Sequence, residues 1–339
     1  MNKFFKEATK EYQARCRCCQ SQLSSPVVFL SNMPLTDDFI KVDNLNREEF
    51  LSDILIYECQ SCGLVQNPAD FDHERYYQDY QYSSGHSIFA KNFMRKYAQI
   101  LINTFKDING RDPESVIEIG SGDGVQLQQF LDLGIPQVLG IEPSEYLANI
   151  AIDSGVSSLV DLFGAHSKEK VEMQFDICLS SYTLDHVRNP IEYFETSYQL
   201  LNENGIIAFE IHNLDKIIER TEFSLFEHEH TIYLTPDDAT RFLEQQGFEV
   251  ILIDPIPYES VRGNSLILIA KKVTLAKKNQ KNKSFHNYQL ENLNFRIKKT
   301  ITSLDEWIDS IPDRESLIGF GGGGERCYDF SSFKKLRSF

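Results

Sequence analysis

The stretch SVIEIGSGDGVQL, residues 115–127, decides the fold of this chain. Its first part, up to Ile119, is a short apolar run of the kind that forms a buried parallel strand. The glycine-rich residues 120–124 follow, at the point where such a strand passes into a helix. Glycines let the backbone adopt positive φ and approach a ligand closely, and the first N–H groups of the helix donate to it. The stretch therefore predicts an α/β domain with a nucleotide-type binding loop.

An acidic residue ends the next predicted strand, where a nucleotide-binding α/β unit needs one. Residues 138–141 form that strand, and Glu142 and Pro143 follow it. Glu142 lies 22 positions after Gly120 (142 − 120), close to the spacing of about 20 at which a strand-end acid meets ribose hydroxyls. The loop GSGDG departs from the dinucleotide pattern GxGxxG, and alone it fits a tight turn equally well. Asp161, in a third short strand at 158–162, adds a second acid and favours ligand binding.

Composition places the chain among globular proteins. Its 339 residues are enough for two domains, and 41% are hydrophobic. No stretch approaches the roughly 20 apolar residues of a membrane helix, and the first fifteen residues lack the apolar core of a signal peptide. We therefore expect a cytoplasmic protein without membrane contact. The net charge of −16 argues against nucleic-acid binding but leaves a small anionic substrate open, since a few local donors suffice.

The spacing of the cysteines indicates a metal site. Cys16 and Cys19 form one CxxC, Cys59 and Cys62 form another, and 39 residues lie between them (59 − 19 − 1). Four such thiolates close a tetrahedron around a structural Zn²⁺, and a module this small needs such a staple. Redox-active pairs and ordinary buried thiols are the alternatives, and Cys18 is a spare thiol beside the first pair. We expect about one zinc ion per chain.

Five motifs occur along the chain in an order that resembles one family, the bacterial sugar C-methyltransferases. They are CRCC at 16–19, MPLTDDF at 33–39, ECQSCGLVQ at 58–66, YYQDYQYSSGHS at 76–87 and EIGSGDG at 118–124. Members of this family carry a zinc-binding domain, a class I methyltransferase domain and a C-terminal Rossmann-like domain, and the best understood act on dTDP-linked 3-amino-4-keto deoxysugars. The resemblance, over residues 16 to about 272, implies an α/β fold with a class I methyltransferase Rossmann-like sheet. It divides the chain into a zinc-binding module at 1–75, a methyltransferase domain at 76–272, and a linker helix with an incomplete C-terminal α/β domain at 273–339.

The resemblance also implies S-adenosylmethionine as cofactor and assigns residues to it. Glu118 would orient the loop and the methionine end of the cofactor, and Glu142 would hold the ribose. Asp161 and Leu162 would contact the adenine. The full predicted set is Glu118, Gly120, Ser121, Gly122, Asp123, Glu142, Pro143, Asp161, Leu162 and Ser180.

The α/β pattern continues on both sides of this loop. Helices are predicted at 88–105, 146–154 and 191–201, with another starting at 163–168, and strands are predicted at 175–180 and 206–211. A final strand lies within 262–272, a helical period runs over 287–310, and a strand at 316–320 precedes the glycine turn at 321–324. Ligands gather at the carboxyl end of a strand such as 175–180, and His186 follows that end. A lone histidine there is more often a helix cap, but its place beside the crevice of Gly120 favours a site residue.

Residues 226–230, FEHEH, contain two histidines and two carboxylates just before the apolar IYL. A catalytic metal is disfavoured, because the spacing is not HExxH and no third ligand lies nearby in the sequence. In the family this stretch is the active-site motif. C-methylation beside a ketone needs a base for the α-proton, and histidine suits that role when a neighbouring carboxylate fixes its tautomer. The resemblance thus implies His230 as base, oriented by Glu229, with His186 and Tyr82 positioning the sugar or stabilising the enolate.

Three features depart from the family pattern. Glu227 stands where the family usually has tyrosine, and an ionised carboxylate donates no hydrogen bond. The sequence RGNS at 262–265 stands where the family tends to have GGS. The chain ends fifteen residues after Gly324 (339 − 324), so we expect a shortened member whose tail at 325–339 is poorly packed or docked on the central domain.

The sequence therefore predicts a C-methyltransferase of a nucleotide-linked keto-deoxysugar, carried on dTDP or GDP, that acts as a monomer or weak dimer. One alternative is small-molecule O- or N-methylation, which needs no α-proton base and tolerates Glu227. The other is a non-catalytic relative that binds zinc and S-adenosylmethionine. The catalytic prediction requires residues 228–230 to face the glycine loop across a shared cleft.

Overall fold

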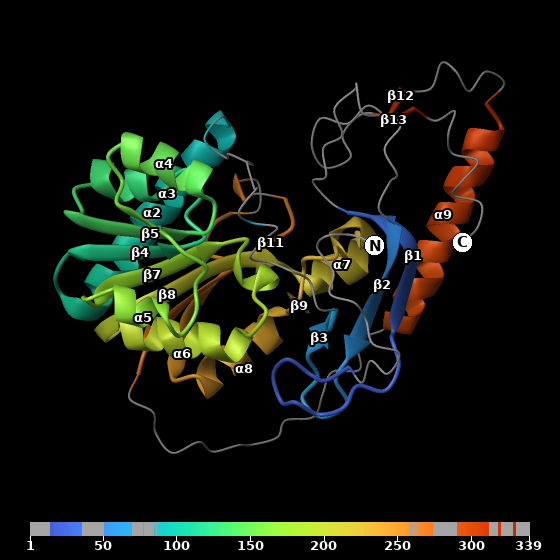
Figure 1. Ribbon diagram of the computed structural model, residues 1–339, viewed down its shortest axis with the longest axis horizontal. Helices are drawn as coiled ribbons and strands as arrows, with labels where there is room; N and C mark the ends of the chain where they lie inside the picture. The colour runs from blue at the N-terminus through green and yellow to red at the C-terminus, as the bar shows by residue number, and fades with distance from the viewer. Residues whose placement is uncertain are drawn as a thin grey trace.

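The computed structural model describes residues 14–35, 51–69, 77, 85, 87–257, 260–261, 263–273, 290–311, 318–319 and 328–329. A large α/β domain and a smaller β-rich module lie side by side (Figure 1). The strand β9 and the helix α7 lie where the two meet. The position of this junction matters, because the segment that carries the FEHEH motif runs through it.

The central sheet has seven strands in the order β10-β11-β8-β7-β4-β5-β6. Strand β11 is antiparallel to both neighbours, and the other adjacent pairs are parallel. All residues of β4 are buried, as expected of an apolar strand in the middle of a sheet covered on both faces. The strands are β4 (Ser115–Ile119), β5 (Gln137–Glu142), β6 (Ser158–Val160), β7 (Phe175–Ser181), β8 (Leu201–His212), β10 (Phe248–Ile253) and β11 (Ser265–Lys272). The predicted α/β sheet is therefore confirmed.

Helices cover both faces of this sheet. The helices α2 (Ile88–Asn109), α3 (Val125–Asp132) and α4 (Glu145–Asp153) pack on one face. The other face is covered by α6 (Pro190–Leu200) and α8 (Pro236–Gln245), with the short α5 (Ser167–Lys170) beside α6. Successive residues of β4 show the division, since Val116 belongs to the core under α2 and Ile117 to the core under α6. The sheet is thus the middle layer of three.

Helix boundaries follow local capping. Helix α2 begins after Ser87, whose hydroxyl accepts the N–H of Ala90, and ends at Gly110 with φ 68°. The helix predicted to start at 163–168 begins only at Ser167. The reason is a turn in which the Ser167 hydroxyl accepts the N–H of Gly164 and the Gly164 carbonyl accepts the N–H of Ser167.

The smaller module is built on a four-stranded sheet in the order β1-β2-β3-β9. Strands β1 (Val28–Pro34), β2 (Leu51–Glu58) and β3 (Val65–Gln66) come from the N-terminal region, and β9 (Ile232–Tyr233) comes from the segment after FEHEH. The region between the two CxxC pairs contributes the strands β1 and β2. One sheet therefore joins residues almost 170 positions apart (Val65 to Tyr233).

Two helices complete the core of this module. Leu214 and Ile217 of α7 (Leu214–Arg220), together with Leu290, Leu293 and Ile297 of α9 (Leu290–Asp309), pack against Val28 and Ile56. Figure 1 shows α9 lying along β1. The helical period predicted over 287–310, within the linker and C-terminal region 273–339, thus forms α9 and contributes to the core of the N-terminal module.

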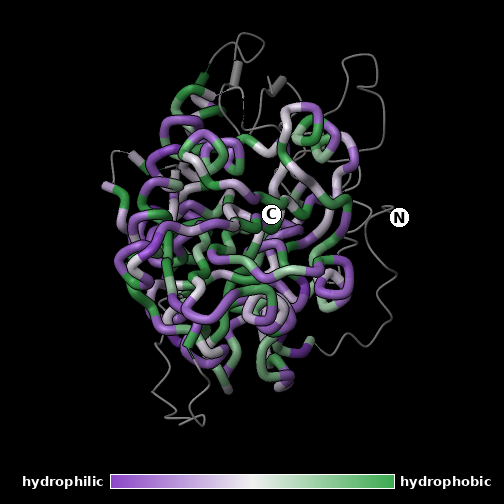
Figure 2. The backbone as a smooth tube through the Cα atoms, turned by 90° about the vertical axis from the view of Figure 1, so that its left-hand side faces the viewer, coloured by the Kyte–Doolittle hydropathy of each residue, from purple (hydrophilic) through white to green (hydrophobic). Residues whose placement is uncertain are grey.

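Hydrophobic and hydrophilic residues alternate along most of the described tube, as amphipathic helices and half-buried strands require (Figure 2). Among the described residues, no helix is both long and apolar enough to cross a membrane. Near the C-terminus, β12 (Ile318–Gly319) pairs antiparallel with β13 (Tyr328–Asp329). The rest of the predicted tail, 325–327 and 330–339, lies outside the described residues.

Candidate active site

The glycine loop joins β4 to α3 with three left-handed residues. Gly120, Gly122 and Gly124 have φ of 71°, 52° and 76°, which a residue with a side chain adopts at a cost. Gly120 is required for a second reason, because a Cβ there would lie 2.3 Å from the hydroxyl oxygen of Thr183. At Gly122 a Cβ would meet no described atom within 4 Å. Thr183 therefore packs closely against the loop at Gly120, whereas the loop surface at Gly122 is uncovered by described atoms.

Glu142 fastens this loop from the end of β5. Its carboxylate accepts the N–H of Gly122 at 2.8 Å and the N–H of Ser144 at 2.8 Å. Burial raises the pKa of Glu142, and these two hydrogen bonds oppose that effect. The Glu142 carboxylate thus holds the loop, a role that the resemblance assigned to Glu118, and Glu118 itself lies buried on β4.

Two of the remaining predicted cofactor residues, Asp161 and Asp123, contact segments on either side of the loop. Asp161 follows β6, donates its backbone N–H to the Glu142 carbonyl, and pairs with Lys170 at 2.9 Å. Asp123 accepts the N–H of Gly85 at 3.1 Å.

Ser180 differs from the prediction, because it is fully buried and its hydroxyl lies 2.7 Å from the hydroxyl of Tyr193 on α6. The Ser180 hydroxyl thus faces α6. Pro143 and Leu162 adjoin Glu142 and Asp161 in the chain, and Ser121 packs beneath the loop, beside Gly140.

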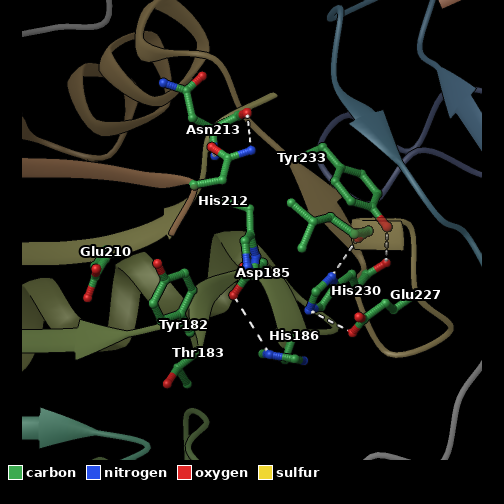
Figure 3. A network of polar contacts seen from close by, with 12 residues as sticks. Tyr182, Thr183, Asp185, His186, Glu210, His212, Asn213, Glu227, His230 and Tyr233 are labelled. Atoms are coloured by element: carbon green, nitrogen blue, oxygen red, sulfur yellow. Dashed lines mark hydrogen bonds and ion pairs between the residues drawn. The ribbon is translucent and has the colours of Figure 1, made fainter. Parts of the chain in front are cut away.

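Three histidines surround one buried carboxylate at the carboxyl ends of β7 and β8 (Figure 3). Asp185 and His186 lie on the short 3₁₀ helix η3 (Leu184–His186), His212 ends β8, and His230 closes the FEHEH segment. The ring centroid of His230 lies 4.6 Å from that of His186 and 5.1 Å from that of His212. Sequence reasoning missed Asp185 and His212, since no spacing links them to FEHEH.

A hydrogen bond to Asp185 orients His212. The Nδ1 atom of His212 donates to the Asp185 carboxylate at 2.7 Å. Burial acts to raise the pKa of Asp185, but the bond from His212 and the nearby imidazoles of His186 and His230 outweigh it and hold the pKa well below its usual range. Asp185 is thus an ionised carboxylate inside the protein. Nε2 of His212 thus keeps its lone pair and accepts no hydrogen bond from the described part of the chain.

A backbone carbonyl fixes the ring of His230. Its Nδ1 lies 2.9 Å from the carbonyl oxygen of Leu225, on the 3₁₀ helix η4 (Phe223–Leu225). Because a carbonyl only accepts, Nδ1 carries the hydrogen and Nε2 keeps its lone pair. The carbonyl thus sets the tautomer, a role that was predicted for Glu229. The Nε2 atom faces the Glu227 carboxylate at 3.5 Å.

The other histidines have distinct surroundings. The Nδ1 atom of His186 lies 2.7 Å from the hydroxyl of Tyr77, so a tyrosine of the 76–87 segment does reach the cluster. Tyr82, the predicted residue of that segment, lies outside the described residues. His228 is turned toward β2, where its Nε2 lies 3.3 Å from the Ser52 carbonyl, and burial lowers its pKa to about 4. His228 is therefore neutral and separate from the cluster.

The cluster and the glycine loop lie at the same edge of the sheet. Thr183, which closes over Gly120, immediately precedes the helix η3 that carries Asp185 and His186. The N–H of Thr231, next to His230, donates to the Asp185 carbonyl at 2.7 Å. This chain of contacts connects the loop to residues 228–230 within one region.

The RGNS turn is used structurally. Asn264 donates to the Glu222 carboxylate and to the Asn213 carbonyl. The hydroxyl of Ser265 donates to the Glu210 carboxylate and accepts from the Tyr182 hydroxyl. Arg262 lies outside the described residues. Asn264 and Ser265 therefore brace the end of β8, from which His212 projects.

The four predicted cysteines converge on one point. The sulfurs of Cys16 and Cys62 lie 3.5 Å apart, as do those of Cys19 and Cys59, and all four lie within 4.8 Å of one another. A tetrahedral Zn²⁺ with bonds of about 2.3 Å places its sulfur ligands about 3.8 Å apart, so the set fits zinc. A hydrogen bond to Cys62 and burial raise the pKa of Cys16 to about 12. A bound cation would therefore be needed to keep these sulfurs deprotonated as thiolates.

Two protein families match the chain. A methyltransferase domain family matches residues 89–253, and a zinc binding domain family matches residues 16–77. The first match runs from α2 to β10, and the second contains all four cysteines and β1 to β3. The large domain therefore has the class I methyltransferase α/β fold, and the N-terminal module is a zinc-binding module.

Individual relatives are distant. NovU, a C-methyltransferase of Streptomyces niveus, is 23% identical over 258 residues, which are 75% of this chain and 60% of NovU. A ubiquinone biosynthesis O-methyltransferase of Dinoroseobacter shibae is 25% identical over 45% of this chain and 68% of that protein. Among solved structures, the plantazolicin methyltransferase BpumL in complex with SAH is 16% identical, with a TM-score of 0.44 over 55% of this chain and 85% of that one. The chain thus spans less than two thirds of the length of NovU.

Proposed function

We propose that this protein is an S-adenosylmethionine-dependent C-methyltransferase that acts on a nucleotide-linked keto-deoxysugar through an enolate. The observation that carries the proposal is the set of three imidazoles around buried Asp185, next to the glycine loop. Transfer to a carbon beside a ketone needs groups that remove a carbon-bound proton, whereas transfer to oxygen or nitrogen does not. The similarity to NovU, whose name describes a C-methyltransferase, supports the same reaction class.

The glycine loop fits the proposed cofactor. The space above Gly122 is open among the described residues, while Glu142 and Asp161 stand at the ends of the two adjacent strands. When bound, S-adenosylmethionine supplies an electrophilic methyl group. The loop amides and Glu142 would hold its nucleoside part, and Asp161 would lie toward the adenine. The protein's own residues must then generate the carbon nucleophile on the substrate.

His230 is the proposed base. Its Nε2 has a lone pair and would take the α-proton of the ketone, so that the C–H electron pair becomes the enolate. Glu227, 3.5 Å from that nitrogen and partly exposed, would then accept the proton and pass it to water. The enolate carbon would then be the nucleophile for the methyl group that a bound cofactor would supply, and the α-proton would leave through His230 and Glu227.

His186 is the proposed stabiliser of the enolate oxygen, because a Tyr77 hydroxyl that donates to its Nδ1 leaves the ring hydrogen on Nε2. His212 presents the lone pair of Nε2 and would accept a hydrogen bond from a hydroxyl or amine of the sugar. Asp185 accepts from Nδ1 of His212, and Tyr77 contacts Nδ1 of His186, so each ring has a fixed orientation. A donor held in place before the reaction costs no reorganisation when charge develops on the oxygen. Glu227, in place of the family's tyrosine, would accept a hydrogen bond from an amine or hydroxyl of the sugar. The substrate class we propose is therefore a dTDP- or GDP-linked keto sugar.

Incubation with a 4-keto sugar nucleotide and labelled methyl donor in D₂O tests this proposal. We expect deuterium at the α-carbon and labelled methyl on carbon, both detected by mass spectrometry. His230→Ala should lower both rates by about 10²- to 10⁴-fold. The matched control is His228→Gln, in the same motif but turned toward Ser52, and it should retain activity.

Three outcomes would contradict the proposal in different ways. A methyl group found only on oxygen would favour the O-methylation suggested by the ubiquinone-pathway relative. A calorimetric titration without S-adenosylmethionine binding would remove the cofactor site. Binding without any exchange or transfer would favour the non-catalytic alternative.

A further inference from the structure

A continuous set of hydrogen bonds runs from the zinc-binding cysteines to the segment that carries His230. Strand β3 begins three residues after Cys62 and pairs antiparallel with β9, which begins two residues after His230. The metal site and the catalytic segment are thus attached to opposite strands of one two-strand ladder.

Gln66 links a cysteine to this ladder. Its side-chain amide nitrogen donates to the sulfur of Cys16 at 3.2 Å, and its amide oxygen accepts the N–H of Arg17 at 2.8 Å. The residue is completely buried and is paired through its backbone with Ile232 of β9. A shift of the first CxxC therefore displaces the strand partner of β9.

Arg17, inside the first CxxC, contacts two other segments of the chain. Its guanidinium donates to the carbonyls of Asn67 at 3.0 Å, Ala69 at 2.8 Å and Arg188 at 3.0 Å. Arg188 follows η3, which carries Asp185 and His186. The Arg17 side chain thus holds both the residues that follow β3 and the residues that follow η3.

Asn67 completes the connection. Its side-chain amide donates to the carbonyls of Glu227 and His228, each at 3.3 Å, and its backbone N–H donates to the Thr231 carbonyl at 3.0 Å. These hydrogen bonds fix the backbone on both sides of His230. Asn67 is buried, and its amide oxygen accepts the N–H of Ala69 at 3.1 Å, which fixes the side chain.

We propose that Arg17 and Asn67 are positioning residues through which the zinc site holds His230 in its working position. No described contact joins either residue to the imidazole ring. Asn67 acts through the backbone of residues 227–231, and Arg17 acts through Asn67 and Arg188. The consequence for catalysis rests on the proposed role of His230, whereas the structural coupling does not. Misplacement of a reacting group by about 1 Å can cost about 10²-fold in rate, so a loosened segment has a large effect.

Hydrogen–deuterium exchange tests the coupling without any substrate. In Asn67→Ala, amides in a peptide covering 225–233 should exchange at least about tenfold faster than in the wild type, while a peptide covering 115–127 is unchanged. Asn67→Asp keeps the acceptor for Ala69, loses the donor and places a carboxylate against the two carbonyls, so it should show at least the same local change. Chelation of zinc and Arg17→Gln should loosen the same peptide.

Asn109→Ala is the matched control. The Asn109 side-chain amide also bridges two carbonyls, those of Phe105 and Asn204, but it lies at the end of α2. This variant should leave exchange at 225–233 and turnover unchanged. Zinc content and S-adenosylmethionine affinity should stay at wild-type values in both Asn67 variants, which shows that the fold is retained.

Turnover separates positioning from substrate binding. We expect kcat of both Asn67 variants to fall by about 10- to 100-fold, with KM changed much less. Unchanged exchange at 225–233 in Asn67→Ala and in zinc-free protein would overturn the coupling. Faster exchange with unchanged kcat would overturn the positioning role. If wild-type protein transfers no methyl group while the exchange pattern holds, the proposed function fails and the coupling stands.

Discussion

Replacing Gly120 by alanine should destabilise the protein by an amount that the loop geometry sets. The residue has φ 71°, and a left-handed conformation costs a residue with a side chain about 1–2 kcal/mol. The new methyl carbon would lie 2.3 Å from the Thr183 hydroxyl oxygen and 2.9 Å from its methyl carbon. Thr183 must therefore move by about 1 Å to restore ordinary contact, and such overpacking costs about 1–3 kcal/mol. We expect a total loss of about 2–5 kcal/mol.

Gly122→Ala is the matched control for this prediction, because φ there is 52° but a Cβ meets nothing described within 4 Å. It should lose only the conformational part, about 1–2 kcal/mol. Urea unfolding followed by circular dichroism measures both variants without ligand. Thr183→Ala in the Gly120→Ala background leaves a nearest contact of 3.1 Å and should recover most of the difference. The reasoning is refuted if Gly120→Ala is no less stable than Gly122→Ala.

Other measurements address the zinc-binding module and two buried titratable groups. Burial lowers the pKa of His228 from 6.5 to about 4, so between these values the unfolded chain binds a proton that the folded chain does not. Stability should fall as pH falls across this window, by up to about 3 kcal/mol, and His228→Gln should flatten the slope. Burial also acts on Asp176, but hydrogen bonds from Arg111, Glu114 and Asn202 outweigh it and lower its pKa. Asp176→Asn should therefore have a lower free energy of unfolding than the wild type at neutral pH. This difference should shrink as the pH falls below 3.8, and a difference that stays constant would contradict the reasoning. Metal analysis of chelator-free protein should give about one zinc per chain, absent from Cys59→Ser. A second bound metal, lost in His212→Gln, would show that Asp185, His212 and His230 bind an ion and that His230 is not free to act as a base.

The sequence alone determined those features whose physical cause is local. The glycines at 120–124 adopt left-handed φ between a strand and a helix, and Glu142 ends the next strand within reach of that loop. The two CxxC pairs brought their sulfurs to tetrahedral distances. In the loop, residue type and short spacing limit the backbone. The two CxxC pairs lie 39 residues apart, and their convergence could be predicted because a structural zinc ion takes four thiolates.

The tertiary structure alone decided how the histidine cluster is assembled. His212 comes from the end of β8, Asp185 from the helix after β7, and His230 from a segment held by β3 of the zinc-binding module. Ser180 shows the same limit, since a strand alternates its sides and only the packing of α6 fixed which side its hydroxyl faces. Spacing along the chain carries no information on such contacts. They depend on which strands pair and which carbonyls lie opposite, as for Leu225, which set the tautomer of His230.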